Sequence, residues 1–148
     1  MKFSKKSRYG VAALIDLAVN SKNGHVALGS IAERNEISPQ YLEQVFASLR
    51  RAGIVKSVKG SQGGYLLKYP SSSITVASII QALEGTYYLD DEETKTEESA
   101  AGIAKTIQED IVDRVNHGLD QILQNLTLAD LEESFQERQS GGQEMYYI

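Results

Sequence analysis

Cysteine is absent from this chain of 148 residues. Its absence excludes disulfides, thiolate zinc sites, thiolate-held iron–sulfur clusters and cysteine nucleophiles within the chain. An apolar run long enough to span a membrane is also missing, and the basic start at residues 1–6 is not followed by the apolar core of a signal peptide. We therefore expect a soluble, cytoplasmic protein with no membrane partner.

Groups suited to catalysis or metal binding are scarce. The two histidines, His25 and His117, are far apart in the sequence and have no ligand partner at a useful spacing. No nucleophile–base pair and no paired carboxylates stand at a defined spacing. The glycine-rich segment 59–64 precedes a predicted strand rather than a helix, so it is neither a P-loop nor a dinucleotide-binding turn. We expect no enzyme activity, no metal and no cofactor.

Positive charge is concentrated in the first half of the chain. Residues 1–70 hold 11 Lys and Arg against 4 acidic residues, a net charge of +7, whereas residues 71–148 hold 4 against 16, a net charge of −12. A basic half is typical of contact with a polyanion, and an acidic half would be repelled from it. Uneven charge also arises by chance in short chains, so this imbalance alone does not identify a partner.

The hydrophobic pattern of residues 1–85 predicts a small, mainly α domain with a β-hairpin. Helices are expected at residues 7–20, 29–36, 38–52 and 75–83, a short strand at 26–28, and hairpin strands at 54–58 and 65–69. The third helix has clear ends, because Ser38 is a good N-cap, Pro39 suits the first helical position and Gly53 stops the helix. A helix, a short helix, a capped helix and a hairpin form the order of a winged helix-turn-helix.

The expected helix at 38–52 carries side chains suited to reading DNA on the face opposite its apolar stripe. Gln40 and Gln44 suit adenine, and Arg51 suits guanine or phosphate. Glu43 can accept from a cytosine amino group, and Lys59 at the hairpin tip can enter a minor groove. Polar residues on a helix exterior are more often an ordinary solvated face, and a glycine-rich turn is often an ordinary hairpin.

The second half of the chain differs in character. We expect an acidic linker or loop at residues 86–102, a dimerisation region at 103–135 and a flexible polar tail at 136–148 that ends in an apolar motif. The long amphipathic helix at 103–126 would place an apolar stripe at an interface between two copies. The stripe residues expected at this interface are Ile107, Ile111, Val115, Leu119 and Ile122. The alternative is that the stripe packs into the chain's own core.

Several short motifs stand in the order and spacing of a known family. They are Ser7–Gly10, Ile31–Arg34, Ile37–Gln44, Leu49–Val55, Ser57–Gly60, Gly63–Leu67 and Ile74–Val76. The chain resembles the bacterial winged-helix regulators that include IscR, NsrR and CymR, densely over residues 2–85 and weakly through Leu128–Leu131. Within that family it is most similar to the cysteine-free CymR-type repressors of cysteine metabolism, because the cluster-binding members carry three cysteines in the region of residues 86–103.

The resemblance implies a homodimeric repressor that binds a palindromic duplex site without an iron–sulfur cluster. The helix at 38–52 becomes the recognition helix, and Lys59 and Gly60 become the wing tip. From the charges and the resemblance together, the expected DNA-binding residues are Lys2, Lys5, Lys6, Arg8, Tyr9, Ser38, Gln40, Tyr41, Glu43, Gln44, Arg50, Arg51, Lys59 and Gly60.

The chain ends in an apolar motif that includes Tyr146, Tyr147 and Ile148. CymR-type repressors end similarly. The resemblance of this chain to them implies a complex with cysteine synthase (O-acetylserine thiol-lyase), in which the enzyme binds the C-terminal carboxylate. The alternative function is therefore a protein-interaction subunit that binds a metabolic enzyme through this tail. A further alternative is that the tail folds back onto its own dimer.

Overall fold

The computed structural model describes residues 3–91 and 98–146, with the side chains of residues 92–99 and 142–148 left undescribed. Lys2, Tyr147 and Ile148, three of the residues expected to make contacts, lie outside this range. The elements are, in order, α1 (Lys5–Asn20), α2 (Leu28–Asn35), α3 (Pro39–Arg51), β1 (Val55–Val58), β2 (Gly64–Leu67), the 3₁₀ turn η1 (Ser71–Ser73), α4 (Val76–Glu84), α5 (Glu98–Ile107), the π-helical η2 (Gln108–Asp113), α6 (Arg114–Leu123) and α7 (Leu128–Tyr146).

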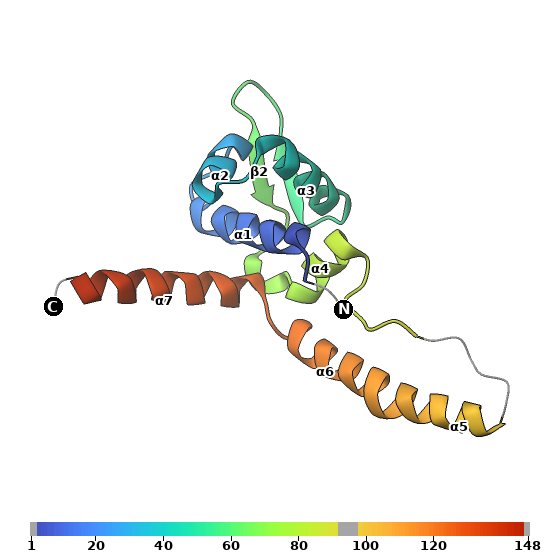
Figure 1. Ribbon diagram of the computed structural model, residues 1–148. Helices are drawn as coiled ribbons and strands as arrows, with labels where there is room; N and C mark the ends of the chain where they lie inside the picture. Colours follow the sequence, from blue (N-terminus) through green and yellow to red (C-terminus); the bar gives the residue numbers. More distant parts are fainter. Residues whose placement is uncertain (1–2, 92–97, 147–148) are drawn as a thin grey trace.

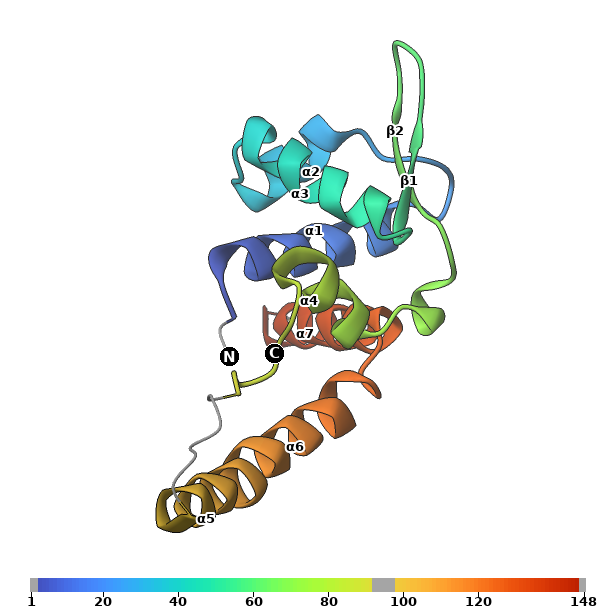
Figure 2. The ribbon, with the colours of Figure 1, turned by 90° about the vertical axis from the view of Figure 1, so that its right-hand side faces the viewer.

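The first four helices and the hairpin form one body around the main core (Figures 1 and 2). The inner stripe of α3, namely Leu42, Val45, Phe46 and Leu49, is completely buried. The helix α1 crosses this core and packs closely on α4 at Gly10, where a Cβ would lie 2.3 Å from Leu83 Cδ1. The predicted mainly α fold with a small hairpin is confirmed.

The helix ends follow the expected chemistry. The Ser38 side chain accepts a hydrogen bond from the Tyr41 N–H at 3.1 Å, and Pro39 starts α3. Thr75 caps α4 in the same way, accepting from the Ser78 N–H at 3.1 Å. The N-cap predicted at Ser38 is thus confirmed, and Thr75 provides a second one. They satisfy backbone N–H groups that have no partner inside the helix.

The predicted hairpin is present, with β1 and β2 antiparallel and Val55 paired with Leu67. The prediction of a separate strand at residues 26–28 was wrong. Only Val26 forms a bridge, exchanging backbone hydrogen bonds with Tyr65 at 3.0 and 2.9 Å, and α2 already begins at Leu28. Gly64 permits this approach, because a Cβ there would lie 2.4 Å from the Val26 carbonyl oxygen.

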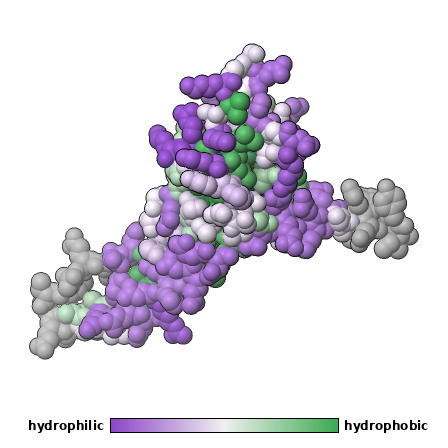
Figure 3. Space-filling model, turned by 180° about the vertical axis from the view of Figure 1, so that it is seen from behind, coloured by the Kyte–Doolittle hydropathy of each residue, from purple (hydrophilic) through white to green (hydrophobic). Residues whose placement is uncertain are grey.

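Beyond the body, α5, η2 and α6 form one continuous helical arm that projects away from it (Figure 1). The predicted long helix is therefore present, although it begins at Glu98, inside the segment expected to be a linker, and contains a π-helical stretch. Ile103, Ile107, Ile111, Val115 and Ile122 are all exposed, at 42 to 66 %. Most of the face of the arm that is seen from behind is hydrophilic (Figure 3).

The base of the arm is anchored by a second, smaller core. Tyr87, only 1 % exposed, lies here with Val76, Ala77 and Ile80. The leucines that pack against them are Leu119, Leu123, Leu126 and Leu131. Residues 86–91 are in no helix or strand, and the buried ring of Tyr87 fixes the start of this loop to the body. Leu119, expected at a dimer interface, is half-buried against this core of its own chain.

The last helix was also underestimated. We expected a flexible polar tail at residues 136–148, but α7 continues to Tyr146. It packs along α1, and Glu132 holds it there through an ion pair with Lys22 at 2.8 Å. No helix in the described ranges is both long and apolar enough to cross a lipid bilayer.

Candidate nucleic-acid interface

The outer face of α3 presents its polar side chains to solvent. Gln40, Glu43, Gln44, Arg50 and Arg51 are exposed, whereas the opposite face of the helix is buried. These side chains form two rows at helical spacing. Gln40, Gln44, Ala47 and Arg51 share one outward face and could touch one groove together, whereas Glu43 and Arg50 lie to one side of this row.

The row of Glu43 and Arg50 faces the hairpin. Between α3 and the hairpin lies an open hollow of 420 Å³, whose walls include Glu43, Ala47 and Arg50 on one side and Ser57, Val58 and Gly63 on the other. The sequence pattern did not show which side chains of α3 face the hairpin. Helical periodicity gives the faces of the helix but not the position of the hairpin. In Figure 2 the hairpin projects above the helices of the body.

The hairpin tip has the composition and backbone of a wing. Lys59 and Gly60 are exposed, and Gly60 has a φ of +124°, a value that L side chains rarely adopt. The Gly63 N–H closes the turn on the Gly60 carbonyl at 3.1 Å. Gly63 is also required by space, since a Cβ there would lie 2.3 Å from the Val58 carbonyl oxygen. The basic side chain of Lys59 is therefore carried on a thin, glycine-rich turn.

The start of α1 adds further positive charge. Lys5 and Arg8 are exposed and Lys6 is half-buried, and the Arg8 guanidinium carbon lies 5.2 Å from the centre of the Phe3 ring. Ser4 and Ser7 fix this end of the helix by donating hydrogen bonds to the Glu84 carboxylate of α4, the latter at 2.7 Å. Glu84 is 77 positions from Ser7 in the sequence, and only the fold places it beside α1.

Three of the expected DNA-binding residues have structural roles. Tyr9 and Tyr41 are half-buried at the edge of the core and meet edge to face, with ring centres 5.7 Å apart. Ser38 is the N-cap of α3. DNA contact by these three remains a prediction. By contrast, the ion pairs found among the described residues involve Arg34, Lys22 and Lys105, and none of the candidate DNA-binding cations.

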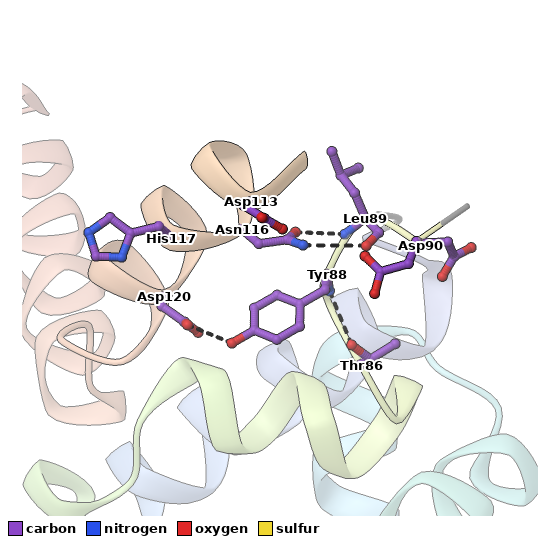
Figure 4. A pocket seen from close by; sticks show the side chains of 9 residues that line it. Thr86, Tyr88, Leu89, Asp90, Asp113, Asn116, His117 and Asp120 are labelled. Carbon is purple, nitrogen blue, oxygen red and sulfur yellow. Dashed lines mark hydrogen bonds between the residues drawn. The ribbon is translucent and has the colours of Figure 1, made fainter. Parts of the chain in front are cut away.

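A second hollow lies where residues 86–91 run beside α6 (Figure 4). Tyr87 and Tyr88 both donate hydrogen bonds to the Asp120 carboxylate, the latter at 2.5 Å, and the Asn116 side chain bonds both backbone groups of Leu89. The hydrogen bond from Tyr87 is the main reason that the pKa of Asp120 is lowered. Burial is the main reason that the pKa of Tyr87 is raised to about 12, and its hydrogen bond to Asp120 is the second reason. This polar seam joins the segment to the arm.

Comparison with known proteins identifies the family. A model of the Rrf2 family, described as an iron-dependent transcriptional regulator, matches residues 3–134. The chain belongs to the Rrf2 family. The regulator IscR of Yersinia enterocolitica is 38 % identical over 88 % of this chain and 79 % of its own length. As an Rrf2 member, the chain is a DNA-binding transcriptional regulator and not an enzyme.

Solved structures of Rrf2 regulators share its fold. CymR of B. subtilis, the global cysteine regulator, is 37 % identical with a TM-score of 0.64, covering 90 % of this chain and 98 % of its own. IscR of T. potens is 40 % identical with a TM-score of 0.72, covering 94 % and 91 %. The hollow between α3 and the hairpin is thus part of a winged-helix fold that this chain shares with both CymR and IscR.

The iron implied by the Rrf2 description does not fit the donors of this chain. Thiolates are impossible without cysteine. Around the hollow of Figure 4 the candidate donors are carboxylates and His117, and Asp120 is already engaged by two tyrosines. Among residues 3–91 and 98–146, no three His, Asp or Glu side chains are grouped so that they could hold a metal ion. We derive no iron-dependent step for this protein.

Proposed function

We propose that this Rrf2 regulator is a homodimeric repressor of cysteine and sulfur metabolism genes that acts on a palindromic site without an iron–sulfur cluster. The main support for DNA binding is that the exposed face of α3 and the basic wing lie on either side of one hollow. A duplex can place base edges against Gln40 and Gln44 while a strand of its backbone passes Arg50 and the wing.

Dimerisation is supported by the exposed stripe of the arm. Ile103, Ile107, Ile111, Val115 and Ile122 are large apolar side chains with 42 to 66 % of their surface exposed, on a rod with little of its own chain to cover it. Burying apolar surface is the dominant favourable contribution to association, and an antiparallel pair of such rods gives a two-fold axis. Two winged domains related by this axis would read the two halves of a palindrome.

The regulated pathway is proposed from similarity. The B. subtilis relative is described as the global cysteine regulator, and its chain aligns over nearly all of its length with this one. The absence of cysteine argues against a thiolate-held sensor cluster. A signal would then have to reach the protein as a small molecule or a partner protein.

The proposal can be tested with duplexes selected by the wild-type protein from a random pool. We expect recovered sites with two-fold symmetry, bound with an affinity that falls steeply as salt rises, because phosphate contacts release counterions. Sites from sulfur-metabolism promoters should compete for binding. Selected sites without symmetry would refute the dimeric docking, and the lack of any selected site would refute sequence-specific binding.

A further inference from the structure

His25 lies on the loop between α1 and α2 and reaches across to the wing. Its Nε2 atom is 2.5 Å from the backbone carbonyl oxygen of Gln62, a residue 37 positions later in the turn between β1 and β2. Both residues are exposed. In the sequence His25 is a candidate only for metal binding, and its contact with Gln62 arises from the fold.

The chemistry of the contact is defined by its acceptor. A carbonyl oxygen can only accept a hydrogen bond, so Nε2 of His25 must carry the proton, in either the neutral Nε2–H tautomer or the imidazolium form. The bond is therefore donated from the loop after α1 to the wing. It does not depend on the identity of the side chain at position 62.

The turn that receives this bond has few other restraints. Among the described residues, the backbone hydrogen bond from Gly63 to Gly60 is the one found within this turn in addition to the β1–β2 ladder. The paired residues Val26 and Tyr65 anchor only the base of the wing on this side. Glycines at 60, 63 and 64 leave the backbone between these points with many accessible conformations. The His25 bond is a tether nearer the tip.

We propose that His25 is a positioning residue that holds the wing turn, and with it Lys59, in place for DNA through the Gln62 carbonyl. The inference rests on the proposed use of the wing in DNA binding. A turn held before binding loses less conformational entropy when it meets the duplex. His25 itself is not assigned a contact with phosphate.

The first test measures the affinity of full-length variants for a duplex selected by the wild-type protein. His25→Ala should weaken binding about two- to tenfold, the range expected for one hydrogen bond. His25→Gln, which keeps an N–H donor of similar reach, should recover most of the loss, whereas His25→Phe, which keeps the ring without the donor, should not. His117→Ala removes the other histidine, on α6, and serves as the matched control with wild-type affinity.

The second test separates positioning from direct contact. If His25 acts through the wing, its removal should leave the salt slope of binding unchanged and should have a much smaller effect in a Lys59→Ala background. Additive effects of the two substitutions would mean that His25 acts independently of Lys59, and a lower salt slope for His25→Ala alone would mean that His25 touches phosphate; either result would overturn the proposal. Wild-type affinity of His25→Ala would also overturn it, while leaving the proposed DNA-binding function intact because the wild-type protein provides that measurement.

Discussion

Asp120 accepts hydrogen bonds from two neighbouring tyrosines, and this pairing fastens the segment after α4 to the arm. Both phenols come from residues 87 and 88, which a composition-based interpretation assigned to a linker. Tyr87 is buried, so its hydroxyl needs a partner, and Asp120 and Gln124 supply it. The free energy of this arrangement depends on the protonation of each group.

We expect the stability of the native state to decline in strong alkali as Tyr87 ionises. Its pKa is raised from 10.0 to about 12, so the folded state holds the proton more tightly than the unfolded state. The resulting stabilisation is complete below pH 10 and is lost as the pH rises through about 12. Urea unfolding between pH 8 and 12 should show a steeper loss for the wild type than for Tyr87→Phe, and identical slopes would contradict this assignment.

The wing and α3 should affect DNA binding in different ways. Lys59→Ala should weaken binding to all duplexes and lower the salt slope by roughly one unit, because it removes one phosphate contact. Gln44→Ala should instead relax preference at one or two base pairs, at a cost of about 1–3 kcal/mol per lost base contact. Affinity measured on single-substitution duplexes distinguishes the two, and wild-type behaviour of both variants would refute the docking.

At the scale of elements, the π-helical η2 affects the direction in which the apolar row of the arm runs. Ile103, Ile107, Ile111, Val115 and Leu119 recur every four residues. In an α-helix each step of four overshoots a full turn by about 40°, so the row would spiral around the rod. The wider turn of η2, residues Gln108–Asp113, takes in an extra residue and corrects much of this drift.

The stripe itself should decide the oligomeric state. Ile111→Glu places a charge at an exposed apolar position of the arm, and we expect monomers that bind a single half-site weakly. Lys105→Glu adds an acid elsewhere on α5, at a side chain that is 75 % exposed, and should remain dimeric. Sedimentation velocity would compare the two. A dimeric Ile111→Glu protein would show that another surface associates.

Leu119 is a poorer probe than Ile111, although both are in the predicted stripe. Its side chain packs on the second core beside Tyr87, so Leu119→Glu would damage the fold of its own chain as well as an interface.

The sequence predicted the elements whose signals are local and missed those that depend on distant contacts. Ser38, Pro39 and Gly53 define α3 through capping and backbone preferences, and these act within a few residues. Tyr87 lies in a polar stretch, and only the leucines of α6 and α7 make it a core residue. The length of α7 was missed because its outer half is polar, and polar residues do not show whether a helix continues.

The site shows the same division. Periodicity placed Gln40 and Gln44 on the outer face of α3, where they are exposed. It could not show that Glu43 and Arg50 face the hairpin, nor that His25 meets Gln62, because both facts depend on how the hairpin folds against the helices.

At the scale of the whole molecule, the chain end offers a test of the alternative function. If cysteine synthase captures the terminal carboxylate, deleting Ile148 should abolish that complex and leave the dimer and its DNA affinity unchanged. O-acetylserine should compete with the tail for the enzyme. Titration of purified enzyme with both forms is the measurement. Equal affinities would exclude tail insertion, and loss of the dimer would indicate that the tail folds back on it.

The opposite charges of the two halves also make the folded chain an electric dipole. Its basic pole includes the start of α1, the outer face of α3 and the wing, whereas the acidic residues are concentrated after residue 84 in the sequence. The field of an approaching duplex would exert a torque on such a molecule and turn the basic pole toward it before contact. Because screening limits this torque to roughly 8 Å at physiological ionic strength, orientation would be corrected only in the last moments of an encounter.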